Sequence, residues 1–380
     1  MSTTVSANPT ALRARLEKAR AAAATAGVDA MLMAPGSDLT YLLGGSGSSF
    51  ERLTCLVVPA GSGTGQPPVL VVPKLEAPGY DAVPTGELGV EIATWVDDED
   101  PYALVAGVVG GAARVALGDM MPALHVLGLR RALSGAEQTL AGPILRELRM
   151  RKDAEEIAGL RRAGAAIDRV HARMAEFLQV GRTEAEVGAD IAAAIVEEGH
   201  TLADFVIVGS GPNGASPHHA LSDKVIEAGE VVVVDIGGPM PDGYNSDSTR
   251  TYAMGEPRDA DVAETYAVLQ AAQRKAVESV RPGGTAESVD AAARDVIADA
   301  GFGEKFIHRT GHGIGLDVHE EPYIVRGNTL PLEPGMAFSV EPGIYQAGRW
   351  GARIEDIVVV TEDGVEPLNL RPHELTVLPA

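Results

Sequence analysis

The sequence predicts two domains, an α/β domain over residues 1–147 and, over residues 148–380, a second domain built from two similar halves. The chain of 380 residues is long for one domain, since domains average about 150 residues. Its first part alternates helix-like and strand-like segments. Its second part contains two similar helical segments, at residues 181–199 and 283–301.

The first expected element is a helix over residues 10–26, because this alanine-rich segment spaces Leu12 and Leu16 one turn apart and stops at Gly27. Short apolar runs bounded by Gly, Pro or Asp then predict the strands of a central sheet. These runs lie at residues 30–33, 54–58, 69–72 and 115–117. This part of the sequence contains no cluster of catalytic residue types.

A charged helical stretch over residues 146–178 marks the domain junction, with Ile157, Leu160, Ile167 and Met174 on one face. The interleaved charges of this stretch are typical of a solvated helix face rather than of a recognition surface.

The two similar segments share a helix-capping threonine, Thr183 or Thr285, and a terminal glycine, Gly199 or Gly301. Two alanine-rich helices can match by chance, but the order downstream is also shared. Each helix is followed by a glycine-bearing loop, a strand with one carboxylate, and a second carboxylate further on. We therefore expect two halves that contribute carboxylates to one centre.

Composition excludes several classes of protein. With 53 acidic and 31 basic residues, the formal net charge of −22 opposes contact with nucleic acid. Cys55 is the only cysteine, which excludes internal disulfides and cysteine-rich zinc modules and favours a reducing compartment. The N-terminus does not resemble a secretory signal, and the apolar runs are too short to cross a bilayer. We expect a soluble, cytoplasmic protein.

Four carboxylates lie in or beside apolar, strand-like sequence: Asp235, Asp247, Glu341 and Glu355. One such residue is commonly structural, since strands often end in Asp before a turn. Four are harder to explain, because unpaired anions are expensive to desolvate. Their segments contain no lysine, and two arginines neutralise only part of the charge. This pattern predicts divalent cations.

His312 adds an imidazole to this oxygen-rich set, which suits Mn(II), Co(II), Fe(II) or Zn(II) with little selectivity among them. Two such ions activate water and polarise a carbonyl, which favours hydrolysis. Further histidines are available to orient a substrate and stabilise an oxyanion, although a lone histidine is more often a satisfied core residue. These are His218, His308 and His319, whereas His200 and His219 have no supporting neighbours.

Five segments resemble, in order, the motifs of the pita-bread metallopeptidases: VVVDIGG, GYNSDSTRTY, HRTGHGIGLDVHEEPY, FSVEPGIY and ARIEDIVVV. About 145 N-terminal residues, including SDLTYLLGG, resemble the creatinase/prolidase N-terminal domain. The resemblance implies an α+β pita-bread domain with a pseudo-twofold repeat over residues 148–380. It also implies hydrolysis of the bond preceding proline in Xaa-Pro dipeptides or short peptides, because methionine aminopeptidases lack that N-terminal domain.

The resemblance further implies a dinuclear metal centre, with manganese as the first expectation and cobalt, zinc or iron as alternatives. Asp247 and Glu355 correspond to the bridging ligands, and Asp235 to the ligand on one metal. His312 and Glu341 correspond to the ligands on the other, and Glu341 also to the general base. Asp235 and Asp247 are one residue further apart than is usual in the family, which a longer hairpin turn accommodates.

Four more positions carry roles by the same resemblance. His319 corresponds to a histidine that contacts the substrate and the tetrahedral intermediate, and His218 to one near the scissile amide. His308 and Arg353 line or buttress the pocket. Tyr323 departs from the pattern, because some prolidases carry there an arginine that grips the dipeptide carboxylate, so strict dipeptidase specificity is an open alternative to aminopeptidase P-like activity.

Two other hypotheses about function stay open at this point. The same fold supports different C–N or C–S chemistry in relatives such as creatinase. Degenerate pita-bread domains also serve as non-catalytic binding modules, which the acidic charge permits. The family resemblance also leads us to expect a homodimer.

Overall fold

The computed structural model describes residues 8–45, 47, 51–61 and 65–380. The chain divides into two compact units, Met1–Arg149 and Met150–Ala380. The boundary expected after residue 147 falls within the helix α6 (Gly142–Arg149). Part of the N-terminus, where no secretory signal is expected, lies outside the described residues. Among the helices that the structure describes, none is long and apolar enough to cross a membrane.

The N-terminal unit is built on a six-stranded sheet with the order β4-β3-β2-β1-β5-β6. Its pairs β1–β5, β5–β6 and β3–β4 are parallel, whereas β2 runs antiparallel to both β1 and β3. In chain order its elements are α1 (Pro9–Thr25), β1 (Ala30–Met33), α2 (Ser37–Leu43), β2 (Cys55–Pro59), β3 (Val69–Pro73), η1 (Ala77–Tyr80), α3 (Thr85–Leu88), β4 (Glu91–Trp95), α4 (Pro101–Val109), β5 (Arg114–Leu117), α5 (Ala123–Ala132), β6 (Glu137–Leu140) and α6.

The four strands expected from apolar runs are confirmed as β1, β2, β3 and β5, which form the interior of the sheet. The helix expected over residues 10–26 is also confirmed, since Asn8 caps α1 through its side chain and Gly27 takes a left-handed φ of 67° just after it. The edge strands β4 and β6 were not expected. Their side chains are largely exposed, so their sequences carry no apolar run.

The C-terminal unit contains three sheets, of four strands (β17-β9-β8-β7), five strands (β11-β10-β12-β15-β16) and two strands (β13-β14). In chain order its elements are α7 (Ala154–Ala172), α8 (Met174–Phe177), α9 (Glu184–Glu197), β7 (Phe205–Ser210), η2 (Gly211–Ala215), β8 (Val231–Pro239), β9 (Asn245–Met254), α10 (Val262–Ser279), α11 (Ala286–Asp299), η3 (Gly303–Lys305), β10 (Gly311–Gly313), β11 (Glu320–Ile324), β12 (Ala337–Val340), β13 (Gly343–Gln346), β14 (Trp350–Arg353), β15 (Asp356–Val360), β16 (Val365–Pro367) and β17 (Thr376–Leu378).

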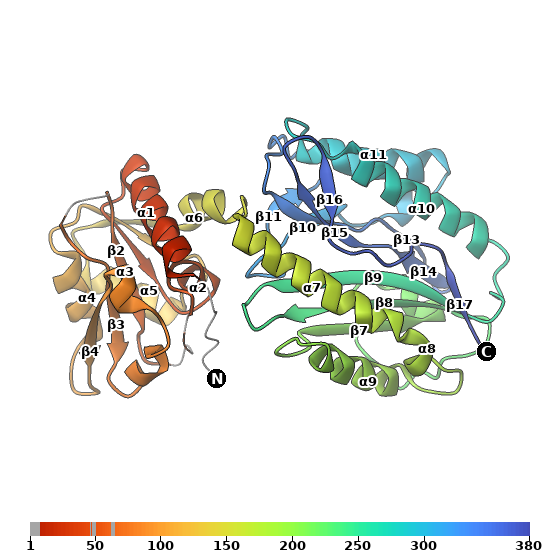
Figure 1. Cartoon of the computed structure of the whole chain (residues 1–380), viewed down its shortest axis with the longest axis horizontal. Helices are drawn as coiled ribbons and strands as arrows, with labels where there is room; N and C mark the ends of the chain where they lie inside the picture. The colour runs from red at the N-terminus through yellow and green to blue at the C-terminus, as the bar shows by residue number, and fades with distance from the viewer. Residues whose placement is uncertain (1–7, 46, 48–50, 62–64) are drawn as a thin grey trace. The chain divides into compact units, whose positions relative to one another are not determined.

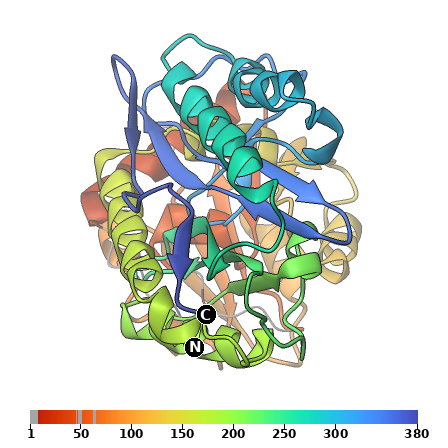
Figure 2. The same cartoon turned by 90° about the vertical axis from the view of Figure 1, so that its right-hand side faces the viewer.

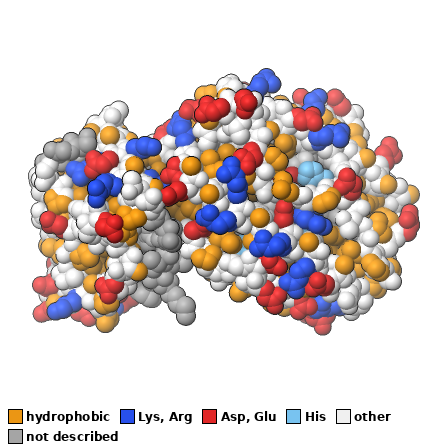
Figure 3. Space-filling model, viewed as in Figure 1, with side chains coloured by type: hydrophobic (Ala, Val, Ile, Leu, Met, Phe, Trp, Pro, Cys, Tyr) orange, Lys and Arg blue, Asp and Glu red, His pale blue; other side chains and the backbone are white. Residues whose placement is uncertain are grey.

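The strands of this unit lie between two sets of helices, with α10 and α11 on one side and α7 to α9 on the other (Figures 1 and 2). One buried apolar cluster joins α10 and α11 to β12 and β15, and another joins α7 and α9 to β7, β8 and β9. Acidic and basic side chains are interspersed on the face seen in Figure 3. The two helix layers enclose the sheets on which the charged strand residues lie.

The internal repeat is confirmed in the backbone hydrogen bonds. Thr183 caps α9 and Thr285 caps α11, each accepting a hydrogen bond from the backbone three residues later. The amide of Gly181 donates to the carbonyl of Ile226, and the amide of Gly283 donates in the same way to Leu332. The helices α9 and α11 are thus anchored by matching turns in the two halves.

The charged stretch over residues 146–178 is not one helix, as the sequence suggested. Helix α6 ends at Arg149, and α7 begins after the capping residue Asp153, whose carboxylate accepts hydrogen bonds from the first turn. Between them the amide of Lys152 donates to the carbonyl of Gly335, so this segment leaves the helical path to contact the C-terminal sheet. Long-range backbone pairing therefore overrides local helix propensity here.

Candidate metal centre

Five side chains from the two halves of the C-terminal unit converge in one place. Asp235 lies in the middle of β8, not at the end of a strand as the sequence suggested, and Asp247 lies in the adjacent β9. His312 lies in β10, Glu341 directly follows β12, and Glu355 directly precedes β15. Their ligand atoms fall into overlapping groups whose members lie within 4.8 Å of one another. These groups are Asp235, Asp247 and Glu355; His312, Glu341 and Glu355; and Asp247, His312 and His319.

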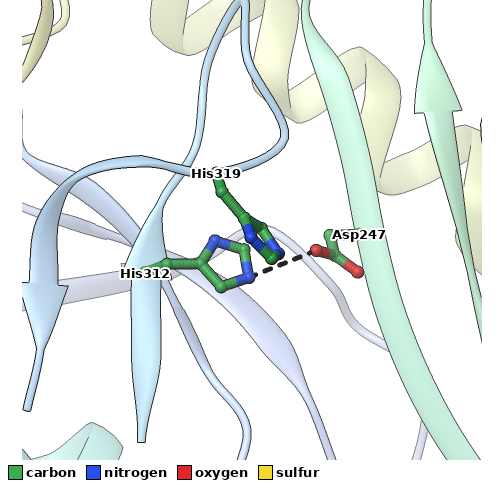
Figure 4. Close-up of side chains that lie close together, drawn as sticks. All are labelled: Asp247, His312 and His319. Carbon is green, nitrogen blue, oxygen red and sulfur yellow. Dashed lines mark ion pairs between the residues drawn. The ribbon is translucent and has the colours of Figure 1, made fainter. Parts of the chain in front are cut away.

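His312 presents an unprotonated nitrogen to the carboxylates. Its Nδ1–H donates to the carbonyl of Gly313 at 3.1 Å, and burial, followed by the nearby His319, lowers its pKa to about 3. The neutral ring therefore carries its lone pair on Nε2. That atom lies 3.5 Å from Oδ2 of Asp247 (Figure 4) and 3.3 Å from Oε1 of Glu341. A lone pair facing two carboxylates is repelled by them unless a proton or a metal cation lies between.

The carboxylates themselves repel one another. Burial and the charge of Glu355 raise the pKa of Asp247 well above its ordinary value. Burial, Glu341 and Asp235 do the same to the pKa of Glu355, and burial raises the pKa of Glu341 to about 7. Oδ1 of Asp235 is buried and has no hydrogen-bond partner within the described ranges. Unsatisfied oxygen donors of this kind fit hard or borderline divalent ions.

Arg353 organises one side of this cluster, and only 2% of its surface is exposed. Its guanidinium forms an ion pair with Asp235 at 2.5 Å. Its Nε donates to the hydroxyl of Thr249 at 3.1 Å, which in turn donates to Glu355 at 2.7 Å. One arginine thus orients two of the five carboxylate and imidazole groups, the second through Thr249.

The remaining histidines take different places. The ring of His319 lies 3.8 Å from the ring of His312, beside Asp247 (Figure 4), and its side chain is exposed. His308 is half-buried. Its Nε2 accepts from the hydroxyl of Tyr345, which also accepts from Arg353, so Tyr345 links His308 to Arg353. Burial lowers the pKa of His308 to about 4. His218 is exposed, and it lies near enough to His308 and His319 to contribute electrostatically to the lowered pKa of each.

Two histidines without supporting neighbours in the sequence have structural partners. His200 is buried against Ser246, with 2.7 Å between its Nε2 and the hydroxyl, and His219 contacts Glu184 at 2.8 Å.

Three hydroxyl groups of the site were not predicted from the sequence. Thr249 and Tyr345 contact Arg353, and Ser339 accepts from the amide of His312 while donating to Glu341 at 3.0 Å. Ser339 lies two residues before Glu341, on the same face of the strand, which was the one available signal.

Two family models match this chain. The model described as metallopeptidase family M24 matches residues 158–362, and the model described as the creatinase/prolidase N-terminal domain matches residues 15–151. The two matches fall almost wholly in separate compact units of the structure.

Curated relatives match over nearly the whole chain. A protein of Mycobacterium tuberculosis named "Probable dipeptidase PepE" is 60% identical over 96% of each chain. The "Xaa-Pro dipeptidase" of Lactobacillus helveticus is 37% identical over 90% of this chain and 92% of its own. Among solved structures, dipeptidase PepE from Mycobacterium ulcerans has a TM-score of 0.92 at 58% identity, covering 98% of this chain and all 100% of its own. A recombinant prolidase from Thermococcus sibiricus has a TM-score of 0.88 at 37% identity, covering 96% and 98%.

Proposed function

The chain belongs to metallopeptidase family M24, and on that basis we propose that it hydrolyses the peptide bond preceding proline in Xaa-Pro dipeptides. The observation that carries the proposal is the convergence of four carboxylates and a neutral imidazole from both halves, with an unprotonated Nε2 and an orphaned Oδ1 among them. Relatives named Xaa-Pro dipeptidase and prolidase support the choice of substrate. Proline has a tertiary amide without N–H, which favours a dedicated pocket.

Divalent metal ions are the cofactor of this family, and the residues present fit them. In this proposal Asp235, Asp247, His312, Glu341 and Glu355 would hold the ions. Manganese is the proposed ion, with cobalt, zinc or iron as outcomes of the test. When bound, a pair of such ions lowers the pKa of water and polarises a carbonyl.

The side chains around the ions have the remaining roles, which are proton transfer and substrate binding. Glu341 is proposed to take a proton from water and return it to the leaving nitrogen. Ser339 fixes the carboxylate of Glu341 by donating to its Oε1. Burial, together with the charges of Arg309 and His218, lowers the pKa of His319, which keeps its imidazole neutral and able to donate one hydrogen bond to a substrate carbonyl. His218 is proposed to contact the scissile amide.

Arg353 and His308 have a supporting role in this proposal. Arg353 holds Asp235 directly and Glu355 through Thr249, so it maintains the spacing of two proposed ligands. The Nδ1–H of His308 donates to the carbonyl of Arg309 at 2.7 Å, and its Nε2 accepts from Tyr345. The ring is therefore held in one tautomer and buttresses the wall behind Arg353.

A second candidate is aminopeptidase P-like activity on longer peptides. It is favoured by Tyr323, which replaces the carboxylate-binding arginine of some prolidases and lies with its ring 4.4 Å from the guanidinium of Arg309. A similar structure, X-Pro aminopeptidase from Thermotoga maritima, is 30% identical with a TM-score of 0.79.

The test uses purified enzyme stripped with a chelator and reloaded separately with Mn(II), Co(II), Zn(II) or Fe(II). Each form is assayed on Ala-Pro, Leu-Pro, a proline-second tripeptide and Ala-Ala. We expect activity on the Xaa-Pro dipeptides to disappear with the chelator and return with Mn(II) or Co(II), whereas Ala-Ala is cut slowly or not at all. A stripped enzyme that remains fully active overturns the proposal, and a preference for the tripeptide favours the second candidate.

We also propose a cytoplasmic location and a homodimeric assembly. The location is supported by the single, buried cysteine, Cys55, which suits a reducing compartment. The assembly rests on the family resemblance, and size-exclusion chromatography with light scattering tests it: a mass near 39.5 kDa, that of one chain, contradicts a dimer.

A further inference from the structure

Glu184 is a buried carboxylate that the proposed mechanism does not use. It is the first residue of α9, directly after the capping residue Thr183, and none of its surface is exposed. An ionised carboxylate in this position is costly unless it is fully hydrogen-bonded. The hydrogen-bond partners of Glu184 therefore indicate its role.

The two oxygens of Glu184 bind the start, middle and end of one segment, residues 210–222. Oε1 accepts from the amide and the hydroxyl of Ser210, each at 2.8 Å, and from the side-chain amide of Asn213 at 3.1 Å. Oε2 accepts from Nε2 of His219 at 2.8 Å, from Ser222 at 2.5 Å and from Asn213 at 3.0 Å. Although burial alone would raise its pKa, these hydrogen bonds, chiefly from Ser222 and Ser210, hold the pKa of Glu184 below its usual range. The carboxylate thus closes the segment into a loop.

His218 lies between two anchored neighbours in this loop. The carbonyl of Pro217, on one side, accepts from Arg353 at 3.4 Å. The side chain of His219, on the other side, is held by Glu184. The backbone at His218 is therefore held on one side by Arg353 and on the other by Glu184, while its own imidazole is exposed.

We propose that Glu184 is a positioning residue, which holds the loop of residues 210–222 so that the imidazole of His218 reaches the scissile amide. This inference rests on the proposed function, because it assigns Glu184 an effect that passes through His218. Within the described part of the chain, the hydrogen bonds of the Glu184 carboxylate all go to residues 210–222. Its contribution is to restrict where the backbone at His218 lies.

The second half of the domain contains a parallel arrangement, which supports the inference. Asp290 is a buried carboxylate on α11, the helix equivalent to α9, and it accepts from the amide and hydroxyl of Thr310 at 3.1 and 2.8 Å. Its ion-pair partner Arg294 donates to the carbonyl of His308 at 2.8 Å. In each half, a buried acid on the equivalent helix holds a segment that carries a proposed active-site histidine.

A double-mutant cycle with Mn(II)-loaded enzyme and Ala-Pro tests the proposal. Glu184→Gln is compared with His218→Ala and with the double variant. Glu186→Gln is the matched control, because Glu186 is an exposed carboxylate on the same helix whose partner is Thr183. We expect Glu184→Gln to lower kcat/KM by about 100-fold, the size of effect that a misplacement of about 1 Å produces. In the His218→Ala background the same change should have almost no further effect, and metal content should stay at the wild-type value.

Additive losses in the cycle, or a Glu184→Gln variant with wild-type kcat/KM, overturn the inference. A second readout is independent of turnover: NMR of the His218 ring protons in the diamagnetic Zn(II) enzyme should shift or broaden with Glu184→Gln and not with Glu186→Gln. If Glu184→Gln does not fold, His219→Asn removes one contact of the loop and enters the same cycle and NMR comparison. A wild-type enzyme inactive on all Xaa-Pro substrates refutes the proposed function instead, and the NMR comparison then decides the role of Glu184.

Discussion

Metal binding to this chain should release protons, because the proposed ligands hold them when no cation is present. The pKa of Glu341 is raised to about 7, so this carboxyl is about half protonated at pH 7 and about one-tenth protonated at pH 8. The pKa values of Asp247 and Glu355 lie well above their ordinary values, and each adds up to about one proton. We expect a release between about half a proton and about two and a half protons per chain at pH 7.

The sign of the pH dependence follows directly. Protons and cations compete for the same oxygens, so metal affinity falls as pH falls and rises as the carboxyls lose their protons. Each proton released makes binding about tenfold tighter per pH unit. The contribution of Glu341 is largest below pH 7 and nearly absent at pH 8.

Isothermal titration calorimetry measures this release. The stripped enzyme is titrated with Mn(II) at pH 6, 7 and 8 in buffers of different ionisation enthalpy, and the slope of observed enthalpy against buffer enthalpy is the number of protons. Glu341→Gln serves as control, since it should reduce the release at pH 7 by at least about half a proton, because loss of its charge also lowers the pKa values of Glu355 and Asp247. An observed enthalpy that does not depend on the buffer would show that the carboxylates are already ionised and that the reasoning from burial and repulsion is wrong.

Three further predictions concern Ser339, Tyr345 and His171. Ser339→Ala removes the hydroxyl that links the amide of His312 to Glu341, and it should weaken metal affinity by about 10–100-fold in a chelator competition, whereas unchanged affinity contradicts this role. Tyr345→Phe removes the hydroxyl between Arg353 and His308 and should lower the free energy of unfolding by about 1–3 kcal/mol in urea titrations, with an unchanged m-value. His171, whose pKa burial lowers from 6.5 to about 3, stays neutral in the fold while the unfolded chain gains a proton below pH 6.5. Stability should therefore fall by about 1.4 kcal/mol per pH unit from this group as pH drops from 6.5 toward 3, and urea titrations of His171→Gln at pH 7 and 5 should show a flatter profile.

Much of the fold could be predicted from local patterns, because the signals that define those elements are themselves local. The interior strands β1, β2, β3 and β5 are apolar runs bounded by turn residues, and α9 and α11 begin at capping threonines. The edge strands β4 and β6 have no apolar run, because their side chains are largely exposed. The break between α6 and α7 depends in part on pairing with Gly335, far along the chain, although the capping box of Asp153 and Glu156 is a local signal for the start of α7.

The candidate site divides in the same way. The sequence alone indicated which residue types form the site and in what order, since buried anions in apolar strands require cations wherever they meet. These residues are Asp235, Asp247, His312, Glu341 and Glu355. Which atoms face one another depends on strand register, and a slip of one residue turns every side chain to the opposite face. For that reason only the tertiary structure shows that Thr249 links Arg353 to Glu355 through hydrogen bonds. The same is true of the hydrogen bonds by which Glu184 binds the loop that carries His218.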